Sequence, residues 1–305
     1  MTDSQIKNTF CEKALECGCD LLMDEPMSRH TTFKIGGPAE IFVEAKDVEA
    51  LKNLVSWAEE SKLKYMLLGN GSNLLVSDKG IEGAVITLGG EFKDIRLVSE
   101  DTIACGAGVT LAKLSSFALE NSLEGLEFAW GIPGTVGGAV FMNAGAYGGE
   151  IKDVLKTCRH MTQNGQVVTL SENDFNFGYR KSIYKENKWT ILDCVFKLKK
   201  GNKEDIKAKM TDFMNRRTSK QPLEYPSAGS VFKRPEGNFA GTLIEQCGLK
   251  GTSVGGACVS EKHAGFIVNK GGATCKDVCD LVELIQKTVK DETGYQLERE
   301  LIIVE

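Results

Sequence analysis

Two glycine-rich stretches of the sequence carry the residue types that bind phosphate groups through the backbone. Residues 131–149 (GIPGTVGGAVFMNAGAYGG) contain seven glycines and three alanines, and residues 68–76 (LGNGSNLLV) set asparagine and serine beside two glycines. Glycine weakens a helix or strand by roughly 0.5–1 kcal/mol relative to alanine, so this density needs a cause. Either another segment packs tightly against these stretches, or successive backbone N–H groups face an anionic ligand.

Neither stretch has the pattern of a common nucleotide-binding loop. The Rossmann fingerprint G-x-G-x-x-G needs a third glycine for close helix–strand packing, but leucine stands there in the motifs that start at Gly69 and Gly106. A Walker A loop is excluded because no glycine run ends in G-K-[ST]. Two separate surfaces of accessible backbone instead fit the pyrophosphate of a dinucleotide that lies between two lobes.

Alternating helices and strands surround these stretches. A strand over 39–45, a helix after the N-cap Asp47 and a strand over 65–68 form one β-α-β unit. A second unit begins with a strand at 103–105 and a helix capped by Thr110.

The chain changes character near residue 200. A helix over 203–217 is followed by an irregular segment, 218–238, with three prolines. Thr274 caps a last long helix that Gly294 ends, and residues 295–305 alternate as a strand. The pattern is α+β: a glycine-rich part in two lobes, then a C-terminal domain.

Composition excludes several classes of protein. A net charge of −5 argues against a nucleic-acid binder. No apolar stretch reaches the roughly 18 residues that cross a bilayer, and the acidic N-terminal segment lacks the pattern of a signal peptide. We therefore expect a cytoplasmic protein without membrane partners. The ten cysteines include no C-x-x-C pair and no histidine at ligand spacing, which predicts reduced, mostly buried thiols and no metal site.

Six motifs in a fixed order give the sequence a specific resemblance. They are HTTFKIGG (30–37), LGNGSNLLVSD (68–78), GIPGTVGGAVFMNAGAYGGE (131–150), GYRKSIYK (178–185), PSAGSVFKRP (226–235) and IVNKGGAT (267–274). Together they resemble the UDP-N-acetylenolpyruvoylglucosamine reductase (MurB) family of bacterial cell-wall synthesis, over residues 30 to 300. The chain resembles the compact class of this family, which lacks a tyrosine-bearing insertion.

The resemblance implies an α+β fold with a two-lobed FAD-binding domain of the vanillyl-alcohol-oxidase/PCMH type and a C-terminal substrate-binding domain. We expect a helical segment at 1–30, the FAD-binding domain at 31–200 (lobes of about 31–90 and 91–200) and the substrate-binding domain at 201–305. We expect a monomer.

The family's reaction has two halves. NADPH reduces a non-covalently bound FAD, and flavin N5 then gives hydride to the enolpyruvyl double bond of UDP-N-acetyl-3-O-(1-carboxyvinyl)-glucosamine, which yields UDP-N-acetylmuramate. No histidine lies within the two glycine-rich stretches, which agrees with non-covalent binding. Without a separate NADPH domain, the nucleotide and the sugar are expected to use one pocket in turn.

The resemblance implies three catalytic residues. Arg180 would bind the substrate carboxylate through two parallel hydrogen bonds, which lysine cannot form. Ser230 would protonate the carbanion-like carbon, and Glu300 would support the developing enolate charge. Strand alternation places Glu298 and Glu300 on one face, so the pattern alone does not choose between these carboxylates; the family position selects Glu300.

A basic segment, 216–234, holds five cationic residues and a single acidic one, and suits the substrate's pyrophosphate. We expect Lys220, Lys233 and Arg234 to contact substrate and Tyr179 to line the same pocket. The expected cofactor-binding residues are Leu68, Gly69, Asn70, Gly71, Ser72, Asn73, Leu74, Gly131, Pro133, Gly134, Thr135, Gly137, Gly138, Asn143, Ala144 and Gly145.

Two other functions remain open from the sequence. The same flavin fold could serve an FAD-dependent oxidase or dehydrogenase of a small hydroxylated substrate. A nucleotide-binding or electron-transfer module without substrate chemistry is the third reading, and the basic, serine-bearing segment argues against it.

Overall fold

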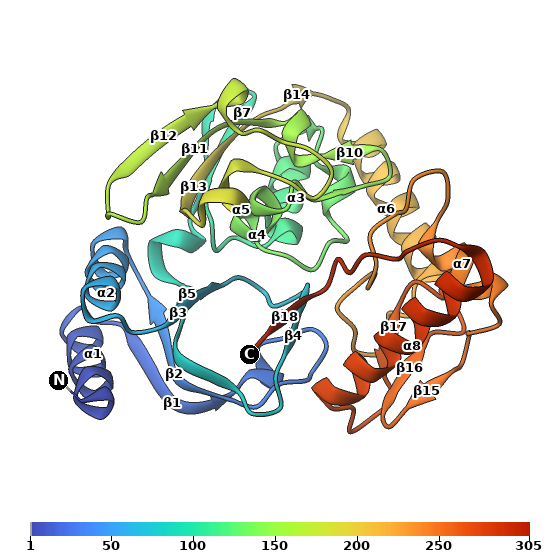
Figure 1. Cartoon of the computed structure of the whole chain (residues 1–305). Helices are drawn as coiled ribbons and strands as arrows, with labels where there is room; N and C mark the ends of the chain where they lie inside the picture. Colours follow the sequence, from blue (N-terminus) through green and yellow to red (C-terminus); the bar gives the residue numbers. More distant parts are fainter. Residues whose placement is uncertain (1) are drawn as a thin grey trace. The chain divides into compact units, whose positions relative to one another are not determined.

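The computed structural model describes residues 2–305 (Figure 1). The chain divides into two compact units, each of which mixes helices and strands. The first unit comprises residues up to 23, 41–69 and 83–216, and the second comprises 24–40, 70–82 and 217–305.

A four-stranded sheet and two helices form one core of the first unit. The strand order is β1 (Asp20–Pro26), β2 (Pro38–Ala45), β5 (Ile81–Leu88) and β3 (Tyr65–Leu68). Helices α1 (Asp3–Glu16) and α2 (Val48–Ser61) bury apolar side chains against it. The predicted N-cap is confirmed, because Asp47 Oδ1 accepts the Ala50 N–H at 2.8 Å.

A five-stranded antiparallel sheet forms the other core of the first unit. Its order is β12 (Val167–Ser171), β11 (Leu155–Met161), β13 (Thr190–Lys197), β7 (Thr102–Gly106) and β6 (Ile95–Ser99). Helices α3 (Leu111–Glu120), α4 (Val136–Phe141) and α5 (Ile183–Asn187) contribute to the same hydrophobic core (Figure 1). The predicted second β-α-β unit is wrong, because the strand after α3, β8 (Leu123–Glu124), pairs outside this sheet with β14 (Lys199–Lys200).

The second unit is built on a three-stranded sheet and two helices. Strands β15 (Ser253–Val254), β16 (Ala257–Val259) and β17 (Ile267–Asn269) pack with α7 (Ala240–Gln246) and α8 (Cys275–Thr293). Thr274 caps α8 as predicted, with its Oγ1 accepting the Asp277 N–H at 3.0 Å, and Gly294 ends it at φ +77°.

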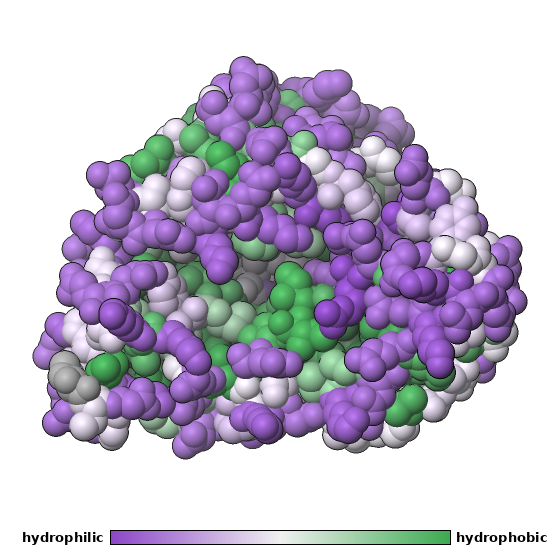
Figure 2. Space-filling view, viewed as in Figure 1, coloured by the Kyte–Doolittle hydropathy of each residue, from purple (hydrophilic) through white to green (hydrophobic). Residues whose placement is uncertain are grey.

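Short elements complete the chain. Strand β4 (Leu74–Val76) pairs in parallel with β18 (Ile302–Val304), and β9 (Gly145–Ala146) pairs with β10 (Gly149–Glu150). The other elements are α6 (Lys203–Lys220), η1 (Met27–Arg29), η2 (Gly90–Lys93), η3 (Glu127–Ala129), η4 (Ile151–Asp153) and η5 (Glu172–Asp174). Half-buried aliphatic residues of β18 contribute to the hydrophobic area visible in Figure 2.

Two sequence-based boundaries differ from the structure. Residues 1–30 hold strand β1 as well as helix α1, so the segment is not purely helical. The predicted strand over 295–305 is confined to Ile302–Val304.

All ten cysteines are free thiols, six of them buried. Among residues 2–305, no helix combines the length and apolarity that a membrane span requires.

One buried side chain in the five-stranded sheet has no polar partner. His160 on β11 is 0% exposed, and neither ring nitrogen has a hydrogen-bond partner among residues 2–305. Its ring stacks on Trp189 with centroids 4.5 Å apart. Burial lowers the pKa of His160, because the charged imidazolium is disfavoured away from water.

We expect His160→Phe to raise the free energy of unfolding by about 1–3 kcal/mol, since phenylalanine keeps the ring stack and removes unpaired buried nitrogens. The wild type should also lose stability as pH falls below about 6.5. His160 then binds a proton in the unfolded chain, whereas its lowered pKa keeps it neutral in the folded protein. Urea titrations at pH 7.5 and 5.5 measure both effects.

His263→Phe is the matched control. Its Nδ1 accepts the Gly265 N–H at 3.1 Å, so this replacement should lower stability. A His160→Phe variant that is less stable than wild type at both pH values would contradict the prediction.

Candidate active site

The two glycine-rich stretches meet within the first unit. A Cβ atom at Gly69 would lie 2.7 Å from Thr135 Oγ1, too close for any side chain. Thr135 caps α4, and its Oγ1 also accepts the Gly138 N–H at 3.4 Å. Gly69, which directly follows β3, therefore touches the start of α4 within the first unit.

Packing within the chain accounts for several of the glycines. A Cβ at Gly71 would lie 2.2 Å from the His30 carbonyl oxygen, and one at Gly149 would lie 2.6 Å from the Phe128 ring. Gly138 differs, because it is exposed and a Cβ there would meet only Thr135 Oγ1, at 3.6 Å. Both explanations offered by the sequence therefore apply, and Gly138 is where open space favours a ligand.

The backbone N–H groups of 131–149 are less accessible than the sequence predicted. The amides of Gly134, Val136 and Gly137 donate to carbonyl oxygens at 2.8–2.9 Å. The expectation of bare amides is therefore wrong for these three residues. In the other stretch, none of residues 2–305 accepts a hydrogen bond from the amides of Gly71–Asn73. These N–H groups fit a phosphate-bearing cofactor such as FAD.

The other expected cofactor residues lie along the same two stretches. Leu68 ends β3 and Leu74 begins β4. The amide of Asn143 is 1% exposed and fully engaged within the chain, so its side chain is not available to a cofactor. The remaining expected residues are Asn70 in the first stretch, and Gly131, Pro133, Ala144 and Gly145 in the second.

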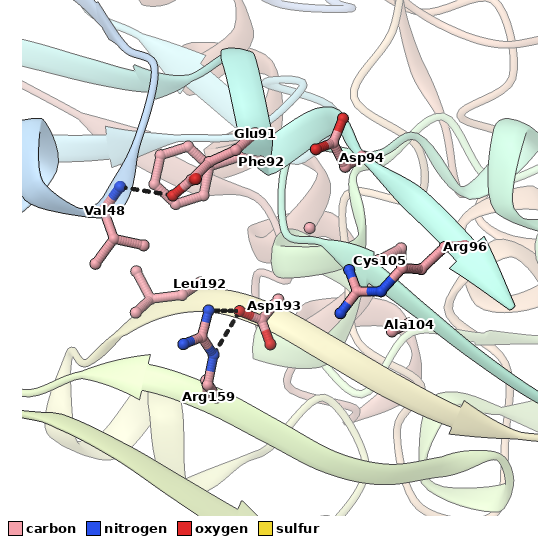
Figure 3. Close-up of a pocket in the computed structure, with 11 residues that line it drawn as sticks. Val48, Glu91, Phe92, Asp94, Arg96, Ala104, Cys105, Arg159, Leu192 and Asp193 are labelled. Carbon is pink, nitrogen blue, oxygen red and sulfur yellow. Dashed lines mark hydrogen bonds and ion pairs between the residues drawn. The ribbon is translucent and has the colours of Figure 1, made fainter. Parts of the chain in front are cut away.

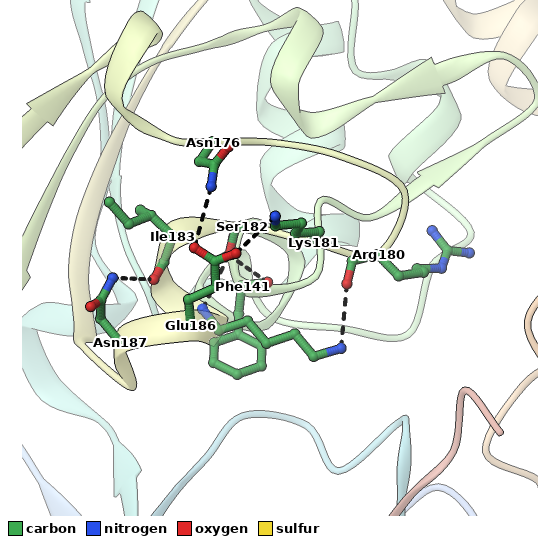
Figure 4. A network of polar contacts seen from close by, with 9 residues as sticks. Phe141, Asn176, Arg180, Lys181, Ser182, Ile183, Glu186 and Asn187 are labelled. Carbon is green, nitrogen blue, oxygen red and sulfur yellow. Dashed lines mark hydrogen bonds and ion pairs between the residues drawn. The ribbon is translucent and has the colours of Figure 1, made fainter. Parts of the chain in front are cut away.

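Arg180 sits at the apex of a two-residue turn in the first unit. Gly178 and Lys181 exchange backbone hydrogen bonds of 3.1 and 3.2 Å, which leaves Tyr179 and Arg180 between them. Arg180 has φ +55°, in the left-handed region that favours glycine. Its guanidinium points away from the polar network around Ser182 and Glu186 (Figure 4).

That network fixes the segment after the turn. Ser182 is fully buried, and its Oγ donates to the Phe141 carbonyl at 2.7 Å, so the segment is tied to the end of α4. Lys181 forms an ion pair with Glu186 at 2.9 Å and lowers the pKa of that carboxyl. The exposed Tyr179 ring lies 5.3 Å from the Arg180 guanidinium carbon.

Ser230 and Glu300 come together in the second unit. The Glu300 N–H donates to the Val231 carbonyl at 2.8 Å, and Phe232 forms a bridge with Arg299. Ser230 is exposed, and its hydroxyl has no hydrogen-bond partner among the described residues. The hydroxyl and the carboxyl group thus lie on neighbouring segments.

The structure separates the two carboxylates that strand alternation left equivalent. The Glu298 side chain is 70% exposed and pairs with Lys233 Nζ at 2.9 Å. Glu300 is half-buried. The regular strand begins only at Ile302, but residues 298–300 pair with 231–233 through the Phe232–Arg299 bridge, so the shared face of the two carboxylates stays a prediction.

The loop after β3 braces the Glu300 segment. Asn73 Nδ2 donates to the Glu300 carbonyl at 3.1 Å, and the Asn73 carbonyl accepts the Ile302 N–H at 3.1 Å. Thr32 Oγ1 donates to the Ser227 carbonyl at 2.8 Å. The motifs at 30–37, 68–78 and 226–235 therefore converge on Glu300 within one unit. No sequence pattern predicted that Asn73 and Thr32 would support this segment.

The expected substrate contacts are divided between the units. Lys220 ends α6 and is exposed, and Lys233 is partly neutralised by Glu298. The Arg234 guanidinium stacks 4.0 Å above the Phe239 ring, which is 55% exposed. Tyr179 and Arg180 belong to the first unit, whereas Ser230 and Glu300 belong to the second.

A cavity of about 320 Å³ in the first unit includes none of the expected site residues (Figure 3). Three of its charged side chains form hydrogen bonds within the chain. Glu91 Oε1 accepts the Val48 N–H at 2.9 Å, and Arg159 Nε donates to Asp193 Oδ2 at 2.7 Å. We assign it no part in the candidate site.

Comparisons with known proteins agree with this geometry. The family model described as "UDP-N-acetylenolpyruvoylglucosamine reductase, C-terminal domain" matches residues 221–304, and the model "FAD binding domain" matches 39–171. UDP-N-acetylenolpyruvoylglucosamine reductases are similar to the chain, at 49% identity in Caldanaerobacter subterraneus subsp. tengcongensis and 47% in Clostridium perfringens, over 93% of each chain.

A solved structure is similar over nearly the whole chain. The UDP-N-acetylenolpyruvylglucosamine reductase (MurB) of Thermus caldophilus matches with a TM-score of 0.81 and 37% identity, over 94% of this chain and 99% of that one. The predicted α+β fold with a two-lobed FAD-binding domain is confirmed.

We expect Arg180→Gly to be more stable than Arg180→Ala by about 1 kcal/mol, because both lose the guanidinium but only glycine adopts φ +55° without strain. Thermal and urea unfolding of the two variants measure the difference. At a position with ordinary backbone angles the alanine variant is more stable than the glycine variant. If Arg180→Ala is more stable than Arg180→Gly, the turn is not strained.

Proposed function

The chain belongs to the UDP-N-acetylenolpyruvoylglucosamine reductase family, and we propose that it reduces UDP-N-acetyl-3-O-(1-carboxyvinyl)-glucosamine to UDP-N-acetylmuramate with NADPH. It is a flavin-dependent oxidoreductase with an FAD-binding domain. The observation that carries the proposal is the hydrogen-bonded connection, in the second unit, of the loop after β3, the Ser230 segment and Glu300.

FAD binding rests on groups that the chain leaves available. The amides of Gly71–Asn73 would hold a phosphate, and the exposed Gly138 would allow close approach of the cofactor. When bound, FAD supplies the hydride that adds to the enolpyruvyl methylene carbon.

The proposed catalytic residues act on the charge that this addition creates. Negative charge develops on the carbon next to the methylene group and spreads into the carboxylate. The planar guanidinium of Arg180 would bind that carboxylate from its place at the apex of the turn, beside the Tyr179 ring. A hydrogen bond from the Glu300 carboxyl group would stabilise the enolate.

Ser230 would transfer its hydroxyl proton to the carbanion-like carbon. A serine hydroxyl is a weak acid, so the transfer requires a strongly basic acceptor. The absence of a hydrogen-bond partner among the described residues leaves the Ser230 proton available. Lys220, Lys233 and Arg234 would bind the pyrophosphate of the substrate.

Other parts of the proposal concern the whole protein. Residues 31–200 would bind FAD non-covalently, and 201–305 would bind the sugar nucleotide. NADPH and the sugar would use one pocket in turn, and the enzyme would act as a monomer in the cytoplasm.

Anaerobic spectroscopy tests the function. Purified protein reconstituted with FAD should be yellow, NADPH should bleach it, and the UDP-enolpyruvyl sugar should restore the colour without oxygen. The sugar without the enolpyruvyl group is the control and should leave the flavin reduced. Recovery with oxygen alone, and none with the sugar, would favour an FAD-dependent oxidase of a small hydroxylated substrate.

Ser230→Ala separates the two half-reactions. Flavin reduction by NADPH should stay within about twofold of wild type, whereas reoxidation by the sugar should slow by roughly 10²-fold, the usual contribution of a general acid. Stopped-flow absorbance measures both rates.

Ser253→Ala provides a control in the same unit, because the Ser253 hydroxyl bonds only to the Gly251 carbonyl on the surface. Equal slowing of both half-reactions in Ser230→Ala would remove Ser230 as the proton donor.

A further inference from the structure

Asn143 forms a buried hub in the first unit. Its Nδ2 donates to Glu150 Oε2 at 2.9 Å and to the Gly178 carbonyl at 3.1 Å, and its Oδ1 accepts the Lys152 N–H at 3.0 Å. The residue is 1% exposed and has φ +44°. Two chain segments, 150–152 and the turn that begins at Gly178, therefore depend on one side chain.

The hydrogen bond from Asn143 to the Gly178 carbonyl anchors the turn that carries Arg180. Gly178 is the residue from which the turn starts, and its carbonyl also accepts the Lys181 N–H at 3.2 Å. Left-handed backbone in a non-glycine residue costs about 1–3 kcal/mol and persists only where the surroundings fix it. Asn143 supplies one such constraint on the strained Arg180.

The hydrogen bond from Asn143 to Glu150 holds a carboxylate in place. The Glu150 carboxylate also accepts a hydrogen bond from Lys152 Nζ at 2.9 Å. The backbone N–H of Glu150 donates to Asp153 Oδ2 at 2.8 Å. The pKa of Glu150 lies below its usual range, chiefly because of the Lys152 hydrogen bond, and Asn143 and the positive charge of Arg180 act in the same direction. Asn143 therefore holds both the backbone of the Arg180 turn and the carboxylate of Glu150.

The sequence pattern suggested a different role for Asn143, as a contact of the cofactor. Such a contact through its side chain would require breaking bonds inside the protein, and an unpaired buried polar group costs about 1–3 kcal/mol. The side chain is thus committed to the chain itself. Only the backbone of residue 143 remains for a cofactor.

We infer that Asn143 is a positioning residue, which couples the glycine-rich stretch 131–149 to the Arg180 guanidinium and so sets how the substrate carboxylate is held. This inference rests on the proposed function of Arg180. Misplacement of a binding group by about 1 Å can cost roughly 10²-fold in rate, so loss of the anchor should be visible in the reaction with substrate.

Asn143→Gly tests this role, because glycine accepts φ +44° and removes only the side chain. Reoxidation of the reduced flavin by the UDP-enolpyruvyl sugar should slow by about 10–100-fold, with a higher sugar concentration needed for half saturation. Reduction by NADPH and the dissociation constant for FAD should stay within about twofold. Equal slowing of both half-reactions would overturn the inference.

Asn176→Gly is the matched control. Asn176 also has a left-handed backbone, at φ +48°, and its side chain bonds to the exposed Glu186 at 3.2 Å rather than to Gly178. Both half-reactions should remain at wild-type rates. A loss in this variant as large as in Asn143→Gly would show that any asparagine of the region gives the same effect.

A double-mutant cycle shows whether Asn143 acts through Arg180. In an Arg180→Ala background, Asn143→Gly should slow reoxidation no further, whereas a full additional loss would contradict the inference. A readout without catalysis is the melting temperature: the gain from Arg180→Gly over Arg180→Ala should shrink once Asn143 is glycine.

The two hypotheses fail in different ways. If the sugar does not reoxidise the wild-type flavin, the proposed function fails, and the melting-temperature cycle still decides whether Asn143 holds the turn. If wild type reacts and both cycles are additive, the reductase function stands and the positioning role is overturned.

Discussion

The hydrogen bond from the Asn73 side chain to the Glu300 carbonyl joins segments 227 residues apart in sequence. It holds the loop that follows β3 against the last segment of the chain, and the parallel pairing of β4 with β18 continues the contact. Glu300 in turn bonds to Val231, which follows Ser230. The part of the candidate site in the second unit depends on this chain of contacts, because short strands alone would not fix these loops.

In both glycine-rich stretches, glycine and asparagine have different structural roles. Glycines allow close approach, as at Gly71 beside the His30 carbonyl, and an asparagine in each stretch supplies side-chain hydrogen bonds to a functional segment. Asn73 donates to the Glu300 carbonyl, and Asn143 donates to the Gly178 carbonyl at the start of the Arg180 turn. Asparagine suits such places because its amide both donates and accepts, and because it tolerates left-handed backbone.

The sequence predicted best what is decided locally. The helices after Asp47, Thr110 and Thr274 are confirmed, since an N-cap and an apolar period act within a few residues. The short β18 strand and the engaged amides of Val136 and Gly137 were not foreseen, because each depends on a partner distant in sequence. The same holds for Asn143, whose partners become neighbours only in the fold. In the sequence, the signal that could have marked Asn143 is an asparagine directly before Ala-Gly, because asparagine tolerates left-handed backbone.

The strained backbone of the Arg180 turn lowers the stability of the folded protein. Glycine at this apex would relieve the strain of the left-handed backbone, about 1–3 kcal/mol, yet it would remove the guanidinium that we propose as the partner of the substrate carboxylate. The amides of Gly71–Asn73 are a second such cost, because N–H groups without acceptors among residues 2–305 gain their hydrogen bonds from water or a ligand. A ligand that satisfies those amides therefore stabilises the folded chain as it binds. Selection for stability alone would remove both features, and their presence together is best explained by binding and catalysis.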